Sequence, residues 1–334
     1  MSPWGAGPRA WRRLGAIPRL DEGDIMRALV TGGAGFIGSN LVETLLKQGH
    51  EVRVIDNFAT GHRRNIEPFM DQIDLVEGDI QSYERAHKAV QDVEVVFHLA
   101  ALPSVPRSVQ DPLTTNAVAV TGTLNVLLSA RDAGVRRVVY ASSSSLYGNN
   151  PVNPRVEDAT PSPLSPYAVA KLTGEHYCRA FANVYDMETV SLRYFNVFGP
   201  RQDPESQYSA VIPRFIRALA NGEGLSIFGD GEQTRDFTFV DNVVAANLLA
   251  ATATIPNGEA FNISCGASVT VNALVAELAD IMGCTAERTY LPARPADVRD
   301  SEADISRARR VLGFEPTVRL REGLERTVAW FTAR

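Results

Sequence analysis

The stretch that decides the fold runs from Arg27 to Asp56 and reads RALVTGGAGFIGSNLVETLLKQGHEVRVID. A short apolar segment leads into a glycine-rich turn, a segment of helical periodicity and a second apolar segment. This order predicts a strand–helix–strand unit. Gly32, Gly35 and Gly38 recur every third residue at the first turn. Glycine is needed where backbone amides at a helix N-terminus approach a pyrophosphate closely, so the unit predicts a dinucleotide site.

The acidic residue at the end of the second strand indicates which dinucleotide binds. Asp56 can accept hydrogen bonds from ribose hydroxyls and would repel a 2′-phosphate, which favours NAD over NADP. Glycine-rich turns also occur without a ligand, but here the turn has both its strand and its helix. We also expect cofactor contacts from Phe36, Ile37 and Asn57.

The alternation of strands and helices continues along the chain. Further strands are predicted at 73–80, 93–101, 135–145 and 187–196, and helices at 83–91, 113–132 and 165–184. Such alternation predicts an α/β fold with a Rossmann-like, doubly wound parallel sheet. Open sheets of this kind bind ligands at the carboxyl ends of their strands. The residues expected to end the third and fourth strands there are Asp79, Ile80, Ala100 and Ala101.

Beyond residue 196 the regular alternation fades, and proline and glycine become frequent. Helical segments are predicted at 209–221, 271–282 and 303–312. We therefore expect a flexible extension at 1–25, an NAD-binding domain at 26–195 with a later return near 236–265, and a smaller, loop-rich substrate lobe at 196–334.

Composition narrows the class of protein. The chain has 334 residues and a net charge of −6, which provides no basic field for nucleic acid or an anionic membrane. Its three cysteines stand far apart, and no spacing suggests a metal site, so we expect no metal and a reducing, cytoplasmic location. No segment beyond the first 25 residues is expected to reach the apolar length of a membrane-spanning helix. His98, inside an apolar strand, is predicted to be a core residue.

The second informative stretch, Ser165 to Tyr177, reads SPYAVAKLTGEHY. On a helix, Tyr167 and Lys171 lie four residues apart on one face. The pair could lie on the surface without a function. Alternatively, the fixed cation could lower the pKa of the phenol so that the phenol acts as a base near neutrality. Spacing alone leaves both interpretations open.

Several motifs occur in order from Met26 onward: TGGAGFIG, EGDI, HLAA, YASSSSLYG, YAVAK and RYFNVFGPRQ. With them the sequence resembles the extended short-chain dehydrogenase/reductase family and, within it, the nucleotide-sugar 4-epimerases. SVPRSVQDP, LSPYAVAKLTGE and SAVIPRFI add a likeness to bacterial enzymes acting on UDP-N-acetylglucosamine (UDP-GlcNAc).

The resemblance implies a catalytic set. Tyr167 would be the base, Lys171 would hold the nicotinamide ribose and lower the phenol pKa, and Ser143 would be the active serine, with Ser142 and Ser144 as neighbours that could be confused with it. The phenol would remove the proton of the sugar 4-hydroxyl while NAD takes the C4 hydride. The 4-keto sugar would then turn over and receive the hydride on its other face, so NAD would stay bound.

The resemblance also implies a UDP-sugar site. The expected substrate-binding residues are Ser104, Ser143, Ser144, Asn196, Val211, Phe228, Arg235, Arg294, Asp297 and Ser301. Arg235 and Arg294 suit phosphate oxygens. Ser301 corresponds to the residue facing the sugar C2 substituent, where enzymes restricted to unacetylated sugars tend to have tyrosine. Serine leaves room for an N-acetyl group.

Alternative substrates and reactions remain open on the sequence. UDP-glucose or UDP-glucuronate could be the substrate, the latter because Arg201 stands near the position that binds a uronate carboxylate. A UDP-sugar dehydratase is disfavoured because Ser-Ser replaces the acidic pair of the dehydratases, and a non-catalytic NAD sensor is disfavoured because the Tyr-Lys pair is present. A UDP-sugar decarboxylase is a further, less favoured alternative. By analogy, the helices at 113–132 and 165–184 predict a homodimer.

Overall fold

The computed structural model describes residues 25–203, 211–293 and 298–333. Its centre is a seven-stranded parallel sheet in which β1 lies between β2 and β4. The strands, in spatial order, are β11 (Glu259–Ile263), β6 (Glu188–Tyr194), β5 (Arg137–Ser143), β4 (Val95–His98), β1 (Arg27–Thr31), β2 (Glu51–Asp56) and β3 (Ile73–Glu77). The predicted doubly wound α/β fold is confirmed.

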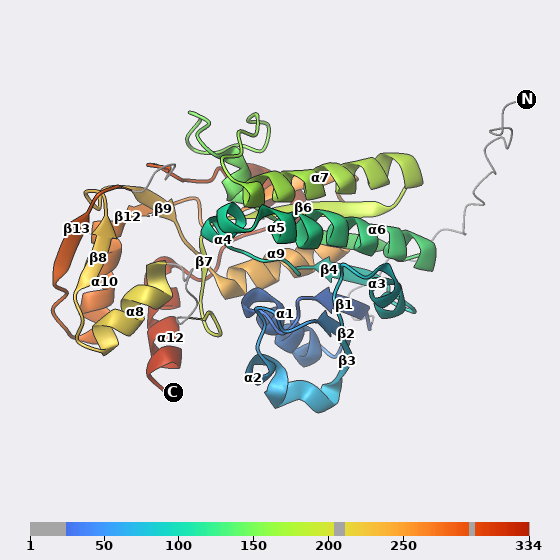
Figure 1. Cartoon of the computed structure of the whole chain (residues 1–334), viewed down its shortest axis with the longest axis horizontal. Helices are drawn as coiled ribbons and strands as arrows, with labels where there is room; N and C mark the ends of the chain where they lie inside the picture. Colours follow the sequence, from blue (N-terminus) through green and yellow to red (C-terminus); the bar gives the residue numbers. More distant parts are fainter. Residues whose placement is uncertain (1–24, 204–210, 294–297, 334) are drawn as a thin grey trace, which may run out of the picture.

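Helices cover both faces of the sheet (Figure 1). On one face lie α3 (Tyr83–Ala89), α4 (Val105–Gln110), α5 (Pro112–Asn116), the π-helical turn η2 (Ala117–Thr121), α6 (Gly122–Ala133) and α7 (Pro166–Tyr185). On the other lie α1 (Phe36–Lys47), α2 (Arg63–Ile66), the 3₁₀ helix η1 (Glu67–Gln72) and α9 (Val240–Thr252). Alternate strand residues serve the two faces: Val30 packs towards α1 and α9, and Leu29 towards α3 and α6. Because both faces of the sheet are buried, its strands are nearly continuous runs of apolar residues.

The C-terminal part packs beside this sheet as a smaller lobe (Figure 1, left). Its short strand pairs are β7 (Val197–Phe198) with β10 (Thr238–Phe239), β9 (Thr234–Asp236) with β12 (Ser268–Thr270), and β8 (Leu225–Phe228) with β13 (Arg288–Leu291). Its helices are α8 (Val211–Ala220), α10 (Val271–Met282), α11 (Ser306–Leu312) and α12 (Leu320–Thr332). The chain returns to the main sheet through α9 and β11.

Several boundaries differ from the sequence predictions. The third strand ends at Glu77 and the fourth at His98, so the residues expected at their ends lie in the turns that follow. The last predicted helix starts three residues later, at Ser306. The helix predicted at 113–132 is interrupted by η2 and continues from Gly122, where a Cβ would lie 2.7 Å from Ile80 Cδ1.

One helical run passes a test of length and composition for crossing a membrane. This run is Pro112–Ala133, although polar residues interrupt its apolar ones. Half of that run is buried inside the protein. The α6 part of this run contributes Val126, Leu127 and Ala130 to a hydrophobic core that also contains residues of α3 and α7. Its apolar character therefore fits a helix packed in the core of this fold.

Candidate active site

The glycine turn forms a cradle between β1 and α1. Gly32 has φ +71° and lies so close to the neighbouring turn that a Cβ would be 2.9 Å from Ala100 Cα. A Cβ on Gly38 would lie 2.2 Å from Gly32 O. Gly35 is the N-cap of α1 and provides no capping side chain, so no N-cap side chain satisfies the first amides of this helix. A diphosphate fits this uncapped helix N-terminus.

Asp56 is fixed against this cradle by two backbone amides. Its Oδ2 accepts from Ala34 N at 2.9 Å and its Oδ1 from Phe58 N at 2.8 Å. Burial raises the pKa of the Asp56 carboxyl, and these two hydrogen bonds oppose that shift. Next to it, Asn57 Nδ2 donates to Asp79 Oδ2 at 2.8 Å. The acidic end of β2 thus borders the glycine turn, as a ribose-binding carboxylate must.

His98 is a core residue with both ring nitrogens engaged. Nδ1 lies 2.8 Å from Thr31 Oγ1 and Nε2 lies 2.9 Å from Thr123 Oγ1. Thr31 Oγ1 also accepts from the backbone amides of Leu99 and Ala100, at 3.2 and 3.1 Å. Burial lowers the pKa of His98 to about 3. The expectation of a core histidine is confirmed, and through Thr31 this residue supports the turn that carries Ala100 and borders the glycine cradle.

The tyrosine–lysine pair lies at the start of α7. Ser165 caps this helix, its hydroxyl accepting from Ala168 N at 3.2 Å. Lys171 is buried, and its Nζ donates to Ala141 O at 2.7 Å. The same Nζ lies 5.9 Å from the centre of the Tyr167 ring. The two side chains therefore share one face, as their spacing predicted.

The structure distinguishes the serines that follow one another at the end of β5. Ser143 hydrogen-bonds the Tyr167 phenol, and its Oγ also accepts from Ser145 N at 3.2 Å. Ser142 instead donates to Glu175 Oε1 at 2.5 Å. The Ser145 hydroxyl is buried and has no hydrogen-bond partner among the described residues. Ser143 is thus the serine in contact with Tyr167.

The expected influence of Lys171 on the phenol is not found in the protein alone. Burial raises the pKa of Tyr167, and the hydrogen bond with Ser143 is what opposes this shift. Burial also lowers the pKa of Lys171 to about 8. The Lys171 ammonium donates to the Ala141 carbonyl.

Two of the expected substrate-binding residues meet at the backbone of Asp236. Asn196, which has φ +35°, donates from Nδ2 to Asp236 O at 2.9 Å, and Asp236 N donates to Ser301 O at 2.9 Å. Arg235 precedes Asp236, and its Nη1 donates to the carbonyls of Thr234 (2.7 Å) and Arg299 (3.1 Å). These residues come from the loop after β6, from β9 and from the segment before α11, so only tertiary structure joins them.

The remaining expected substrate-binding residues are more dispersed. Ser104 is the N-cap of α4, and its Oγ accepts from Arg107 N at 3.1 Å. Val211 opens α8, and Phe228 ends β8 with the Arg214 guanidinium 6.0 Å from its ring centre. Two others, Arg294 and Asp297, lie outside the described residues.

Sequence reasoning missed Asp236. Its buried carboxylate accepts from the amides of Cys265 at 3.2 Å, Gly266 at 3.1 Å and Ala303 at 3.2 Å. Burial raises its pKa to about 6. The available signal was an acidic residue next to the apolar run FTFV. Among the described residues, no group of three or more His, Cys, Asp and Glu side chains could hold a metal ion.

Comparison with known proteins decides the family. The model of the NAD dependent epimerase/dehydratase family matches residues 28–264. The chain belongs to this family. It is 42% identical over 310 residues to a UDP-glucose 4-epimerase of Mycolicibacterium smegmatis, a match covering 92% of this chain and 98% of that protein.

Solved structures of the family superpose closely. A UDP-N-acetylglucosamine 4-epimerase from Methanobrevibacter ruminantium, in complex with UDP-N-acetylmuramic acid, has a TM-score of 0.89 and 39% identity, covering 93% of this chain and 99% of that one. A UDP-glucose 4-epimerase from Thermus thermophilus in complex with NAD has a TM-score of 0.85 and 35% identity, covering 92% and 99%.

These comparisons confirm the predicted family, the NAD cofactor and the prediction that the protein is an isomerase. The residues present fit NAD, since the glycine cradle has no room for a Cβ at Gly32 or Gly38 and α1 begins without a side-chain cap. Asp56 stands where a ribose diol can be bound.

Proposed function

We propose that this protein is an NAD-dependent UDP-sugar 4-epimerase that interconverts UDP-GlcNAc and UDP-N-acetylgalactosamine (UDP-GalNAc). The choice of substrate rests on the small residue Ser301, which is held beside Asn196 by the backbone of Asp236. A tyrosine there would fill the space of an acetamido group, whereas serine leaves it open. Overfilling a packed pocket costs about 1–3 kcal/mol.

The proposed base is Tyr167, paired with Ser143. The Tyr167 phenol removes the proton of the sugar 4-hydroxyl and returns a proton when the alcohol re-forms. Ser143 hydrogen-bonds the phenol and opposes the rise in its pKa that burial causes. Lys171 keeps a cation close to the same site. When bound, NAD supplies a reversible oxidant for the sugar C4 carbon.

The contacts of Arg201 weigh against a uronate substrate. Its guanidinium donates to the carboxylate of Glu43 and, at 3.1 Å, to Ser39 O, both on α1. It also lies 5.8 Å from the centre of the Phe69 ring. A uronate carboxylate would have to compete with Glu43 for this cation. We therefore place UDP-glucuronate behind both UDP-GlcNAc and UDP-glucose.

Product analysis by NMR tests the substrate. UDP-GlcNAc, UDP-glucose and UDP-glucuronate are each offered to the purified protein without added cofactor. We expect UDP-GalNAc from the first and slower conversion of the second. Turnover of UDP-glucuronate with none of UDP-GlcNAc would show that the proposal is wrong.

Two variants separate volume from hydrogen bonding at Ser301. Ser301→Tyr should abolish the N-acetylated reaction and spare UDP-glucose, because only the acetamido group needs the space. The matched variant Ser301→Ala keeps the space and removes the hydroxyl, so it should still convert UDP-GlcNAc. Equal losses on both sugars in Ser301→Tyr would contradict a pocket at the C2 substituent.

The proposed assembly is a homodimer formed through the helices at 113–132 and 165–184, which correspond to α5, η2, α6 and α7. Large apolar side chains are exposed on α5 and α7 and on the neighbouring α4, which contacts both: Leu113 is 83% exposed, Val169 50% and Val109 64%. Figure 1 shows α5, α6 and α7 running side by side over one face of the sheet. Burial of such a face against a second copy would remove apolar surface from water, which supports the analogy with the family.

A further inference from the structure

A buried ion pair lies behind the catalytic residues, and the mechanism above does not use it. Arg193, on β6, is 4% exposed, and Glu175, on α7, is 8% exposed. Arg193 Nε donates to Glu175 Oε1 at 2.9 Å and Nη2 to Oε2 at 2.8 Å. This two-pronged arrangement fixes direction as well as distance. Buried ion pairs add little net stability because both charges lose their hydration, so its geometry is the informative feature.

Glu175 also contacts the strand that carries the active serine. Ser142 Oγ donates to Glu175 Oε1 at 2.5 Å. Tyr167, Lys171 and Glu175 recur every fourth residue, on one face of α7. That face meets three consecutive residues at the end of β5, with Lys171 on the Ala141 carbonyl, Glu175 on the Ser142 hydroxyl and Tyr167 on the Ser143 hydroxyl.

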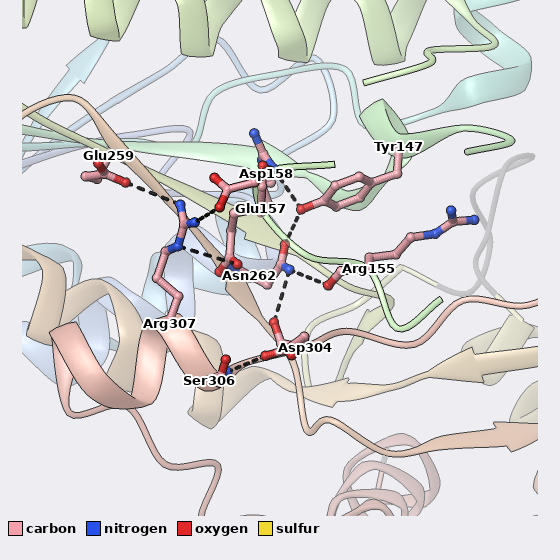
Figure 2. Close-up of polar contacts among 10 residues, drawn as sticks. Tyr147, Arg155, Glu157, Asp158, Glu259, Asn262, Asp304, Ser306 and Arg307 are labelled. Atoms are coloured by element: carbon pink, nitrogen blue, oxygen red, sulfur yellow. Dashed lines mark hydrogen bonds and ion pairs between the residues drawn. The ribbon is translucent and has the colours of Figure 1, made fainter. Parts of the chain in front are cut away.

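The other side of Arg193 holds the segment that follows Ser143. Arg193 Nη1 donates to Tyr147 Oη at 2.7 Å and to Glu157 O at 2.9 Å. Tyr147 belongs to the 3₁₀ turn η3 (Ser144–Tyr147), which begins directly after Ser143. Its hydroxyl donates to Asn262 Oδ1 at 2.7 Å, and Asn262 in turn reaches the carbonyls of Arg155 and Asp304 (Figure 2). The end of β5 is thus held from both sides.

We propose that Glu175, clamped by Arg193, is a positioning residue that fixes the rotation and height of α7 against β5 and so aligns the Tyr167 phenol with the Ser143 hydroxyl. A turn of α7 about its axis would move Tyr167 and Glu175 together, because they share one face. The contact of Glu175 with Ser142, one residue before Ser143, resists that movement. The proposal rests on the proposed roles of Tyr167 and Ser143, and not on which UDP-sugar is the substrate.

Ser142→Ala is the decisive variant because it removes one contact of Glu175 and leaves the ion pair intact. Small displacements of a reacting group cost catalysis steeply, so we expect kcat to fall roughly ten-fold. KM should stay within about two-fold, since no substrate contact is removed. The matched control is Ser129→Ala, because Ser129 on α6 is also buried but its hydroxyl has no hydrogen-bond partner among the described residues.

A second measurement reports on Tyr167 directly. The protein is labelled with 3-fluorotyrosine, and the Tyr167 resonance is assigned by its loss in Tyr167→Phe. If Ser142→Ala weakens the hydrogen bond from Ser143, the titration midpoint of Tyr167 should move to higher pH, because that bond lowers its pKa. Ser129→Ala should leave the midpoint unchanged. This readout needs no turnover, so it remains decisive if the proposed substrate is wrong.

Glu175→Gln should act in the same direction and more strongly, because it also breaks the ion pair. Loss of folding in that variant would leave Ser142→Ala to decide. A Ser142→Ala protein that melts at a lower temperature but keeps the wild-type kcat and Tyr167 midpoint would overturn the proposal. Such a result would assign Glu175 to stability alone.

Discussion

Replacement of His98 by glutamine should remove a specific part of the pH dependence of stability. In the fold, Thr31 Oγ1 already accepts two backbone amides, so its proton is directed at His98 Nδ1. Thr123 donates to Ala119 O at 2.7 Å, so its oxygen accepts from His98 Nε2. This chain of bonds fixes the neutral ring with its proton on Nε2. A second proton on Nδ1 would face the Thr31 hydroxyl proton and would lose that bond.

The magnitude follows from the two pKa values. His98 titrates near 6.5 in an unfolded chain and at about 3 in the fold. Below pH 6.5 the unfolded chain binds a proton that the folded protein does not, so stability falls as the pH falls. Each pH unit in this window is worth about 1.4 kcal/mol. Between pH 6.5 and pH 5 the loss due to His98 is therefore about 2 kcal/mol.

Urea unfolding of wild type and His98→Gln at both pH values isolates this contribution. All other titrating groups are common to the two proteins, so the difference between their unfolding free energies should shrink by about 2 kcal/mol on going to pH 5. The His98 ring resonance in wild type should also show no titration down to pH 5. A constant difference between the two proteins, together with a His98 resonance that titrates near 6.5, would refute the reasoning.

Three further predictions address the site and the assembly. In steady-state kinetics, Tyr167→Phe should lower turnover by about 10²–10⁴-fold and leave substrate binding largely unchanged. Ser143→Ala should lower turnover more than Ser145→Ala. Near-full activity in Tyr167→Phe would contradict the mechanism. The purified protein should release NAD and no NADP on denaturation, and Gly38→Ala should carry much less NAD, because its Cβ would lie 2.2 Å from Gly32 O. Gly224→Ala, whose Cβ would meet nothing closer than 3.8 Å, is the control, and equal NAD content in both would argue against the cradle. Leu113→Glu places a charge on an exposed apolar face and should yield monomers in light scattering; an unchanged mass would locate the interface elsewhere.

The local sequence was sufficient for the framework of this protein. Strand–helix alternation predicted the parallel sheet because apolar periodicity is set by which faces of each element are buried. The glycine turn and Asp56 could also be recognised in the sequence. A close backbone approach and a carboxylate at the end of a strand each depend on residues that are near one another in the chain. The spacing of Tyr167 and Lys171 likewise placed them on one face, because a helix brings residues four apart to the same side.

Tertiary structure decided what depends on partners distant in the chain. Four serines in a row are equivalent in sequence, and only packing against α7 directs Ser142 to Glu175 and Ser143 to Tyr167. The sequence position of Arg201 is compatible with binding a substrate carboxylate. Its contact with Glu43 arises only in the fold. The pKa of Tyr167 also could not be read from its spacing to Lys171, because burial and the hydrogen bond with Ser143 set it. Hydrogen bonds and desolvation are properties of the assembled environment, so a linear pattern does not specify them.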